Sequence, residues 1–284
     1  MTQVKNYLSL IKFSHTIFAM PFAMIGFFLG VYYYPLVQQG NAGLAIGWGR
    51  DMTNLFLWQK LILVIFCMVF SRSAAMAFNR YLDRSFDARN PRTAIREIPA
   101  GIIKANNALW FTILSCILFM ITCFFINTTC FFLAPIALFV VLGYSYTKRF
   151  TPLCHLVLGL GLSLAPIGAY LAVAGRFDWL PLLFSFTVLF WVSGFDIIYS
   201  LQDEEFDKSQ QLYSIPVALG KKSALLVSKI LHLLSALLVI AAGIYGGFGI
   251  WYWIGVAIFI GMLIYQHSIV TPNDLRRVNI AFMT

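Results

Sequence analysis

Long apolar runs dominate this chain and set its fold class. Of its 284 residues, 60% are hydrophobic and only 11% are charged, and the mean hydropathy is +0.82. A soluble protein carries about 25% charged residues, and a helix needs roughly 20 apolar residues to cross a bilayer. The sequence therefore predicts an all-α, polytopic transmembrane helix bundle. We expect about eight complete spans, at residues 16–36, 56–79, 107–126, 129–146, 153–174, 180–200, 223–245 and 248–267.

These spans are expected to form a single transmembrane domain over residues 1–284. The last stretch, from Asp274 to Thr284, reads as the opening of another helix that stops early. We therefore expect a final helix that is truncated in this sequence.

Lysine and arginine are concentrated in every second loop, on one side of the predicted bundle. One side of the predicted bundle carries most of the chain's 20 basic residues, whereas the other has only Arg50, Lys60 and Arg176. Basic loops stay on the cytoplasmic side of a membrane. This pattern predicts a multi-pass protein of a bacterial inner (plasma) membrane whose basic loops face the cytoplasm. It also accounts for the net charge of +9 without nucleic acid as a partner.

Two acidic clusters lie about 120 residues apart, each where an apolar span meets a basic loop. Both contain Asp, two residues and then Phe-Asp, at 83–87 and 203–207. The clusters and their immediate neighbourhood hold seven of the chain's 11 acidic residues: Asp83, Asp87, Asp196, Asp203, Glu204, Glu205 and Asp207. Carboxylates are costly near a bilayer and usually persist there for a functional reason.

Helical spacing gives each cluster a common face. Successive residues at i, i+4 and i+8 advance by roughly 40° each, so Asn79, Asp83 and Asp87 should lie along one face. The second face should hold the four residues Asp196, Tyr199, Asp203 and Asp207. Mg²⁺ prefers oxygen ligands and commonly combines one or two carboxylates with water and substrate phosphate oxygens. We expect Mg²⁺ to bind at Asp83, Asp87, Asp203 and Asp207.

The basic residues near the clusters suit a diphosphate. Arg92, Lys148 and Arg149 fall on the same predicted side as the carboxylates, and Arg72 lies inside a span, seven residues before Asn79. A buried guanidinium needs an anion, which for Arg72 is a diphosphate oxygen, an aromatic carboxylate or a neighbouring aspartate. The alternative for the clusters as a whole is ion pairing at helix ends without a metal.

The sequence around the clusters is weakly duplicated. Each cluster precedes an Ile-Pro pair and a glycine, at 98–101 and at 215–220. We therefore expect two pseudo-repeated halves, with motifs at 79–87 and 196–207.

The residues resemble the UbiA superfamily of intramembrane prenyltransferases. The first motif is Asn79-x-x-x-Asp83-x-x-x-Asp87, followed by Arg92-Thr93 and Pro99-x-Gly101. The second is Asp196-x-x-Tyr199-x-x-Gln202-Asp203-x-x-x-Asp207. Residues 144–151 resemble the family's connecting loop, and residues 12–22 resemble the opening of its 4-hydroxybenzoate-type branch.

This resemblance implies nine transmembrane helices around a central cavity, with Mg²⁺ joining both motifs to a polyprenyl diphosphate. It implies an aromatic prenyltransferase that alkylates a small aromatic acid, such as 4-hydroxybenzoate, in ubiquinone or menaquinone biosynthesis within membrane lipid. Asp196, Tyr199 and Arg72 would be catalytic. The diphosphate would be bound by Asn79, Arg92, Lys148 and Arg149. The chain departs from the family in its incomplete ninth helix.

Two alternatives remain at this stage. One is another acceptor used within the same superfamily: a naphthoate, a porphyrin or a lipid phosphate. The other is a cation-coupled transporter, although transport sites usually lie at mid-membrane on broken helices, whereas these carboxylates gather at the ends of spans.

Overall fold

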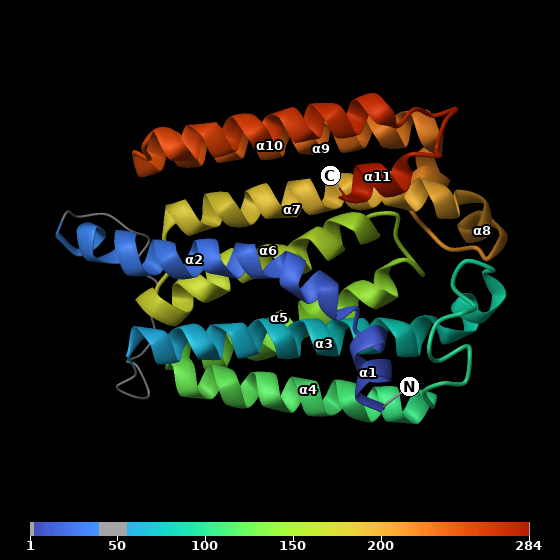
Figure 1. Ribbon diagram of the computed structural model, residues 1–284, viewed down its shortest axis with the longest axis horizontal. Helices are drawn as coiled ribbons and strands as arrows, with labels where there is room; N and C mark the ends of the chain where they lie inside the picture. The colour runs from blue at the N-terminus through green and yellow to red at the C-terminus, as the bar shows by residue number, and fades with distance from the viewer. Residues whose placement is uncertain (1–2, 40–55, 284) are drawn as a thin grey trace. The chain divides into compact units, whose positions relative to one another are not determined.

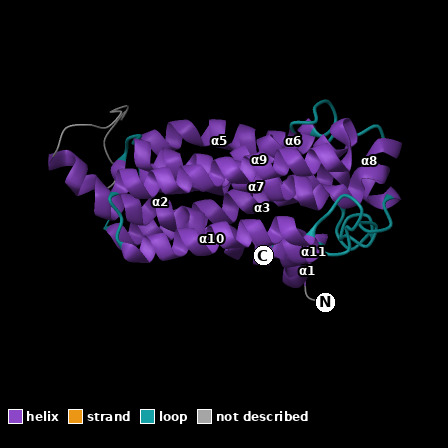
Figure 2. Ribbon diagram, turned by 90° about the horizontal axis from the view of Figure 1, so that it is seen from above, coloured by secondary structure: helices purple, strands orange, loops and turns teal. Residues whose placement is uncertain are grey.

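The computed structural model describes residues 3–39 and 56–283, and this part of the chain is helical without any strand (Figures 1 and 2). The helices, in order, are α1 Gln3–Leu10, α2 Phe13–Gln39, α3 Leu57–Arg89, α4 Ala105–Ile126, α5 Thr128–Thr147, α6 Cys154–Ala174, α7 Trp179–Ser200, the 3₁₀ helix η1 Leu201–Asp203, α8 Glu204–Ser209, α9 Ile215–Gly246, α10 Ile250–Ile269 and α11 Val278–Met283.

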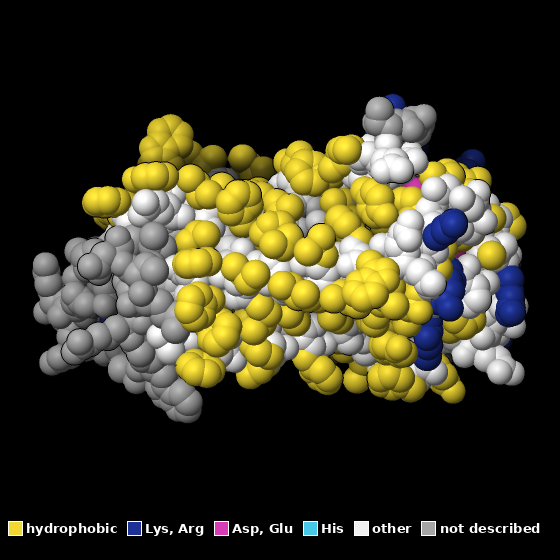
Figure 3. All heavy atoms as spheres, turned by 90° about the horizontal axis from the view of Figure 1, so that it is seen from below, with side chains coloured by type: hydrophobic (Ala, Val, Ile, Leu, Met, Phe, Trp, Pro, Cys, Tyr) yellow, Lys and Arg dark blue, Asp and Glu magenta, His cyan; other side chains and the backbone are white. Residues whose placement is uncertain are grey.

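The helices confirm the predicted all-α, polytopic fold. Among the described residues, seven helices are long and apolar enough to cross a membrane, and α2 adds the shorter apolar stretch Ala19–Tyr33. Together they match the eight expected ranges. Apolar side chains are spread along the middle of the face drawn in Figure 3. Two boundaries differ most: the span expected to end at residue 79 continues as helix to Arg89, and the helix expected to begin at residue 223 begins at Ile215. Of the sparse basic residues expected on one side, Arg50 lies outside the described residues.

The chain divides into two compact units. One comprises Met1–Tyr146 and Leu164–Pro181, and the other comprises Thr147–Ser163 and Leu182–Thr284. Each unit contains one of the two acidic motifs. Helix α6 contributes its first half to the second unit and its remainder to the first.

The first unit is organised around α3. This helix packs along α4, and both α1 and α2 also contact it (Figure 1). Leu10 of α1, Ala77 of α3 and Ala108 of α4 form a fully buried cluster. Phe119 of α4 and Ala134 of α5 lie in a second apolar cluster. Small residues allow helix backbones to approach closely in membranes, so this packing fixes the end of α3 that carries the first motif.

The second unit is held together by polar contacts between small residues of α7 and α9. The hydroxyl of Ser228 donates to the Gly194 carbonyl at 2.7 Å, and that of Ser235 donates to the Thr187 carbonyl at 2.9 Å. Helix α10 packs against α9, and α11 packs against α10. These contacts anchor the end of α7, where the second motif begins.

Helices α6 and α7 approach most closely at Gly159. A Cβ added there would lie 2.3 Å from Ser193 Oγ and 2.4 Å from the Leu189 carbonyl oxygen. Since one of these neighbours is backbone, the helices themselves would have to separate. The lack of a side chain at Gly159 therefore sets the spacing that brings α6 against α7.

We expect Gly159→Ala to lower the free energy of unfolding by about 1–3 kcal/mol, because the added methyl overpacks the α6–α7 contact. Gly168→Ala is the matched control on the same helix, since a Cβ there meets nothing within 4 Å. Alanine is the better helix former, so the control should be neutral or stabilising. Thermal unfolding of both variants in detergent checks this, and equal stability of the two would contradict the close approach.

Candidate active site

The first motif lies on the last turns of α3. Because α3 is one continuous helix from Leu57 to Arg89, the predicted common face of Asn79, Asp83 and Asp87 is confirmed. The amide Nδ2 of Asn79 donates to Oδ2 of Asp83 at 3.0 Å. This contact, one helical turn apart, orients the Asp83 carboxylate.

Asp87 is buried and belongs to an ion-pair cluster. Its Oδ1 lies 2.7 Å from Nη1 of Arg96, and its Oδ2 lies 4.0 Å from Nη1 of Arg80, which is also buried. Arg96 reaches Asp87 from the turns that follow α3. The Thr93 hydroxyl ties these turns back by donating to the Asp87 carbonyl oxygen at 3.1 Å. The loop after the motif thus supplies the cation that balances its carboxylate.

The second motif does not lie on one regular α-helix, as the predicted common face of Asp196, Tyr199, Asp203 and Asp207 assumes, and that face stays a prediction. Helix α7 ends at Ser200, η1 continues to Asp203, and α8 begins at Glu204. The backbone of Asp203 leaves helical geometry, with φ −101° and ψ 1°. The predicted face counts i, i+3, i+7 and i+11 at α-helical spacing, whereas η1 has the tighter 3₁₀ spacing.

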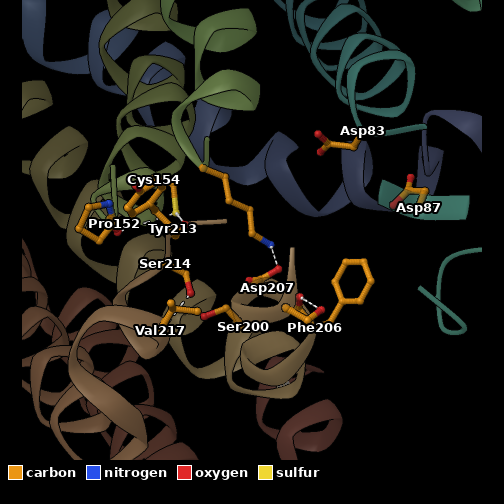
Figure 4. A network of polar contacts seen from close by, with 12 residues as sticks. Asp83, Asp87, Pro152, Cys154, Ser200, Phe206, Asp207, Tyr213, Ser214 and Val217 are labelled. Carbon is orange, nitrogen blue, oxygen red and sulfur yellow. Dashed lines mark hydrogen bonds and ion pairs between the residues drawn. The ribbon is translucent and has the colours of Figure 1, made fainter. Parts of the chain in front are cut away.

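Asp207 pairs with Lys148 across the second unit (Figure 4). Lys148 Nζ lies 2.7 Å from Asp207 Oδ1, and only 1% of the Asp207 side chain is exposed. Burial by itself lowers the pKa of Lys148, but attraction to Asp207 outweighs it and holds that pKa above its ordinary value. Lys148 therefore stays protonated at neutral pH.

Hydrogen bonds also join the connecting loop to the segment that follows the second motif. The Tyr213 amide donates to the Lys148 carbonyl at 2.7 Å. The Cys154 thiol lies 3.7 Å from the Tyr213 carbonyl (Figure 4), and the Ile215 amide donates to His155 Nε2 at 3.4 Å. Together with the ion pair, these contacts hold residues 148–155 against residues 207–215.

Asp87 and Asp207 share a pattern that suits a hard cation. In each, Oδ1 faces a basic side chain at 2.7 Å, while Oδ2 is buried and receives no hydrogen bond. A buried oxygen left without a donor is costly, and carboxylate oxygens are the ligands that Mg²⁺ prefers. Within the described residues, no three His, Cys, Asp or Glu side chains cluster closely enough to hold a metal. A metal at either motif would therefore complete its coordination with water and substrate oxygens.

Asp196 lies against a histidine that sequence reasoning did not connect to it. Its Oδ2 is 2.7 Å from Nδ1 of His155, which α6 places beside α7. The side chain of His155 is 4% exposed and that of Asp196 is 25% exposed. The carboxylate is therefore supported on one side and open on the other.

The structure also gives the positions of the remaining predicted residues. Arg72 lies in α3, two turns before Asn79, and its Nε is buried without a hydrogen-bond partner. Tyr199 ends α7, and Arg149 follows Lys148 in the connecting loop. Arg92 lies in the turn after α3, where its backbone amide donates to Asn90 Oδ1.

Two residues of the site escaped the sequence pattern, His155 and Arg96. Each is distant in sequence from its carboxylate or separated from it by a turn of unknown geometry. Arg96 lies in the loop directly after the first motif, whereas His155 lies near the start of an apolar span, where nothing in its spacing singles it out.

Comparison with known proteins identifies the family. The family model described as the UbiA prenyltransferase family matches residues 42–284. A 4-hydroxybenzoate octaprenyltransferase of Aeromonas salmonicida is 30% identical over 228 residues, which cover 80% of this chain and 78% of that protein. The apo structure of a UbiA homolog from Aeropyrum pernix is 31% identical, covers 95% of this chain and 92% of its own, and has a TM-score of 0.81.

A second solved structure shares the fold at lower identity. It is a UbiA homolog from Archaeoglobus fulgidus bound to DMAPP and Mg²⁺, 20% identical, with a TM-score of 0.65 over 98% of this chain and 95% of that one. Given the family match, the apolar helices and the two motifs on their ends, this chain belongs to the UbiA prenyltransferase family and is an integral membrane prenyltransferase.

Proposed function

We propose that this enzyme transfers a polyprenyl group from its diphosphate to the ring of 4-hydroxybenzoate or a close analogue, in quinone biosynthesis. The observation that carries the proposal is the pair of acidic motifs, each with a buried aspartate whose Oδ1 lies 2.7 Å from a basic side chain. The named activity of the Aeromonas salmonicida relative supports the aromatic acceptor. We further propose that the motifs mark two pseudo-repeated halves of a single domain.

Mg²⁺ is the proposed metal, with Asp83 and Asp87 as its proposed ligands at the first motif and Asp203 and Asp207 at the second. The oxygen-only donor set and the undonated Oδ2 atoms of Asp87 and Asp207 support this, as does the metal named for the Archaeoglobus fulgidus homolog. When bound, Mg²⁺ would neutralise charge on the departing diphosphate.

The chain's own cations act on the same leaving group. Lys148, Arg149 and Arg92 would contact diphosphate oxygens, and Asn79 would donate to one of them. As the allylic C–O bond breaks, the electron pair stays with the diphosphate, and fixed positive charge stabilises it most at that moment. The loop contacts of Lys148 prepare its position before substrate arrives.

The acceptor half of the reaction is assigned to Asp196, Tyr199 and Arg72. Asp196 would accept a hydrogen bond from the acceptor's hydroxyl, which makes the ring more nucleophilic towards the allylic cation. The ring carbon then loses its proton and aromaticity returns. Arg72 would meet either the carboxylate of the acceptor or the diphosphate, since its buried guanidinium requires an anion.

We place the enzyme in a bacterial inner membrane with the motifs towards the cytoplasm. The support is the asymmetry of lysine and arginine between loops and the bacterial source of the similar octaprenyltransferase.

An acceptor panel tests the proposal. Membranes containing the chain are supplied with Mg²⁺ and a labelled polyprenyl diphosphate, together with 4-hydroxybenzoate, a hydroxynaphthoate, a porphyrin or a lipid phosphate. We expect labelled product with 4-hydroxybenzoate at least about tenfold faster than with the others, because only the matched acid satisfies the buried polar groups. Membranes without the chain are the control. Transfer to a lipid phosphate alone, or cation uptake without transfer, would overturn the assignment.

A further inference from the structure

We propose that His155 is a positioning residue that fixes the Asp196 carboxylate for the aromatic acceptor. This inference rests on the proposed function, since it assigns His155 to the acceptor half of that reaction. His155 does not touch the substrate itself in this proposal; it acts through Asp196.

The hydrogen bond between His155 and Asp196 is short and engages only one of the two carboxylate oxygens. Nδ1 of His155 lies 2.7 Å from Oδ2 of Asp196, and the described residues offer no hydrogen bond to the other carboxylate oxygen. The histidine is buried, whereas a quarter of the Asp196 side chain is exposed. One oxygen is thus committed to the protein, and the other is left for a donor from outside, such as a phenolic hydroxyl.

The start of α9 fixes which ring nitrogen carries the proton. The first amides of a helix have no partner within the helix. Here Val217 and Ala218 donate to Ser214, Pro216 has no amide hydrogen, and Ile215 donates to His155 Nε2 at 3.4 Å.

Nε2 therefore accepts, which leaves the proton on Nδ1, where it is donated to Asp196. The helix that follows the second motif thus sets the hydrogen bonding of the carboxylate that precedes it.

The backbone around His155 is also fixed. Its carbonyl accepts from the Ser193 hydroxyl at 3.1 Å, and one turn further along α6 Gly159 permits the close approach of α7. Both contacts join α6 to the turn of α7 just before Asp196. His155 cannot shift relative to Asp196 without opening this contact, so the carboxylate has a single supported orientation.

Three substitutions of His155 distinguish the effect of its hydrogen-bond donor from the effect of its ring volume. The amide nitrogen of asparagine can occupy the place of Nδ1, the amide of glutamine reaches the place of Nε2, and leucine fills the space without a donor. We expect His155→Leu and His155→Gln to raise the KM for 4-hydroxybenzoate or lower kcat by about tenfold or more, the scale of a hydrogen bond to a charged group. The KM for the polyprenyl diphosphate should stay within about twofold, and His155→Asn should recover most of the lost activity.

His232→Leu is the matched control. His232 is also a buried histidine of the second unit, but its ring contacts His267 and the Trp191 carbonyl. Its loss should lower stability without changing the ratio of the two KM values. Equal loss for both substrates in all three His155 variants, or no rescue by asparagine, would assign His155 a structural role and overturn the proposal.

A spectroscopic measurement is independent of turnover. In the full chain with ¹⁵N-labelled histidine, we expect Nδ1 of His155 to be protonated and its signal to move in Asp196→Asn; an unprotonated Nδ1 would overturn the proposal. If the wild-type chain transfers nothing to any aromatic acid, the proposed function fails. An active His155→Leu variant with an unchanged acceptor KM would instead overturn the positioning role alone.

Discussion

Chelation of divalent cations is expected to lower prenyl transfer at least about a thousandfold, with recovery when Mg²⁺ is restored. A diphosphate leaving group carries several negative charges, and the two motifs supply carboxylates rather than enough cations to balance them. Removal of one stabilising group from such a site typically costs 10²–10³-fold, roughly, and loss of a metal removes more than one contact. Initial rates in membranes treated with EDTA, before and after addition of MgCl₂, measure this. A full rate in EDTA would sink the metal assignment.

Substitution of a proposed carboxylate ligand should weaken the binding of Mg²⁺, whereas substitution of another carboxylate should not. Asp87→Asn is expected to raise the Mg²⁺ concentration needed for half-maximal rate by about tenfold or more, because it weakens an oxygen ligand. Glu205→Gln is the matched control: it removes the same charge from an exposed residue of α8. Mn²⁺ should substitute for Mg²⁺ in both. An equal shift in the two variants would mean that the effect reflects net charge and not coordination.

The fold was largely predictable because hydropathy reports directly on bilayer crossing. The motifs were predictable for a related reason, since acidic residues are rare in this chain and concentrated in two places. The face of Asn79, Asp83 and Asp87 followed from helical spacing alone, because the helix that holds them runs unbroken to Arg89.

The second motif shows where that reasoning stops. No glycine or proline interrupts residues 196–207, yet the α-helix gives way to the 3₁₀ helix η1 at Leu201–Asp203 and resumes at Glu204. In this segment Asp207 pairs with Lys148, and Leu201 packs in the core of the second unit. Local spacing cannot register contacts that come from a loop some 60 residues earlier in the chain.

The same dependence on tertiary contacts explains why the sequence did not indicate the partners of Asp196 and Asp87. His155 carries no spacing relation to Asp196, and only the approach of α6 to α7 at Gly159 brings them together. A lone histidine in an apolar run is more often a packing residue than a site residue, so the sequence alone does not indicate a role for His155. Arg96 is one of many basic loop residues and no spacing distinguishes it, whereas in the structure its Nη1 lies 2.7 Å from Asp87 Oδ1.

Lys148→Met should produce the largest effect of any single loop substitution, because Lys148 serves both the fold and the leaving group. Its loss leaves the Asp207 carboxylate buried without its cation, which we expect to cost about 1–3 kcal/mol of unfolding free energy. This is less than for a fully buried pair, since a third of Lys148 is exposed. It should also weaken use of the polyprenyl diphosphate at least about tenfold, with a smaller change in the acceptor KM. Lys208→Met, an exposed neighbour of Asp207 in α8, is the control and should be nearly neutral.

A double-variant cycle then separates the two roles of the pair. Asp207→Asn in the Lys148→Met background removes the stranded charge, so the double variant should be more stable than the sum of the single losses predicts, by about 1–3 kcal/mol. Its turnover should nevertheless stay as low as that of the worse single variant, because both the carboxylate and the ammonium are then missing from the leaving-group side. Thermal unfolding and initial rates on the same four proteins supply both readouts. The ion pair with Asp207 holds the pKa of Lys148 above its value in the unfolded chain. The coupling between Lys148 and Asp207 should therefore be fully present throughout the neutral range, and it should be lost only as the pH rises through the folded-state pKa of Lys148. Additive stabilities at neutral pH would show that the two side chains do not pair in the folded protein.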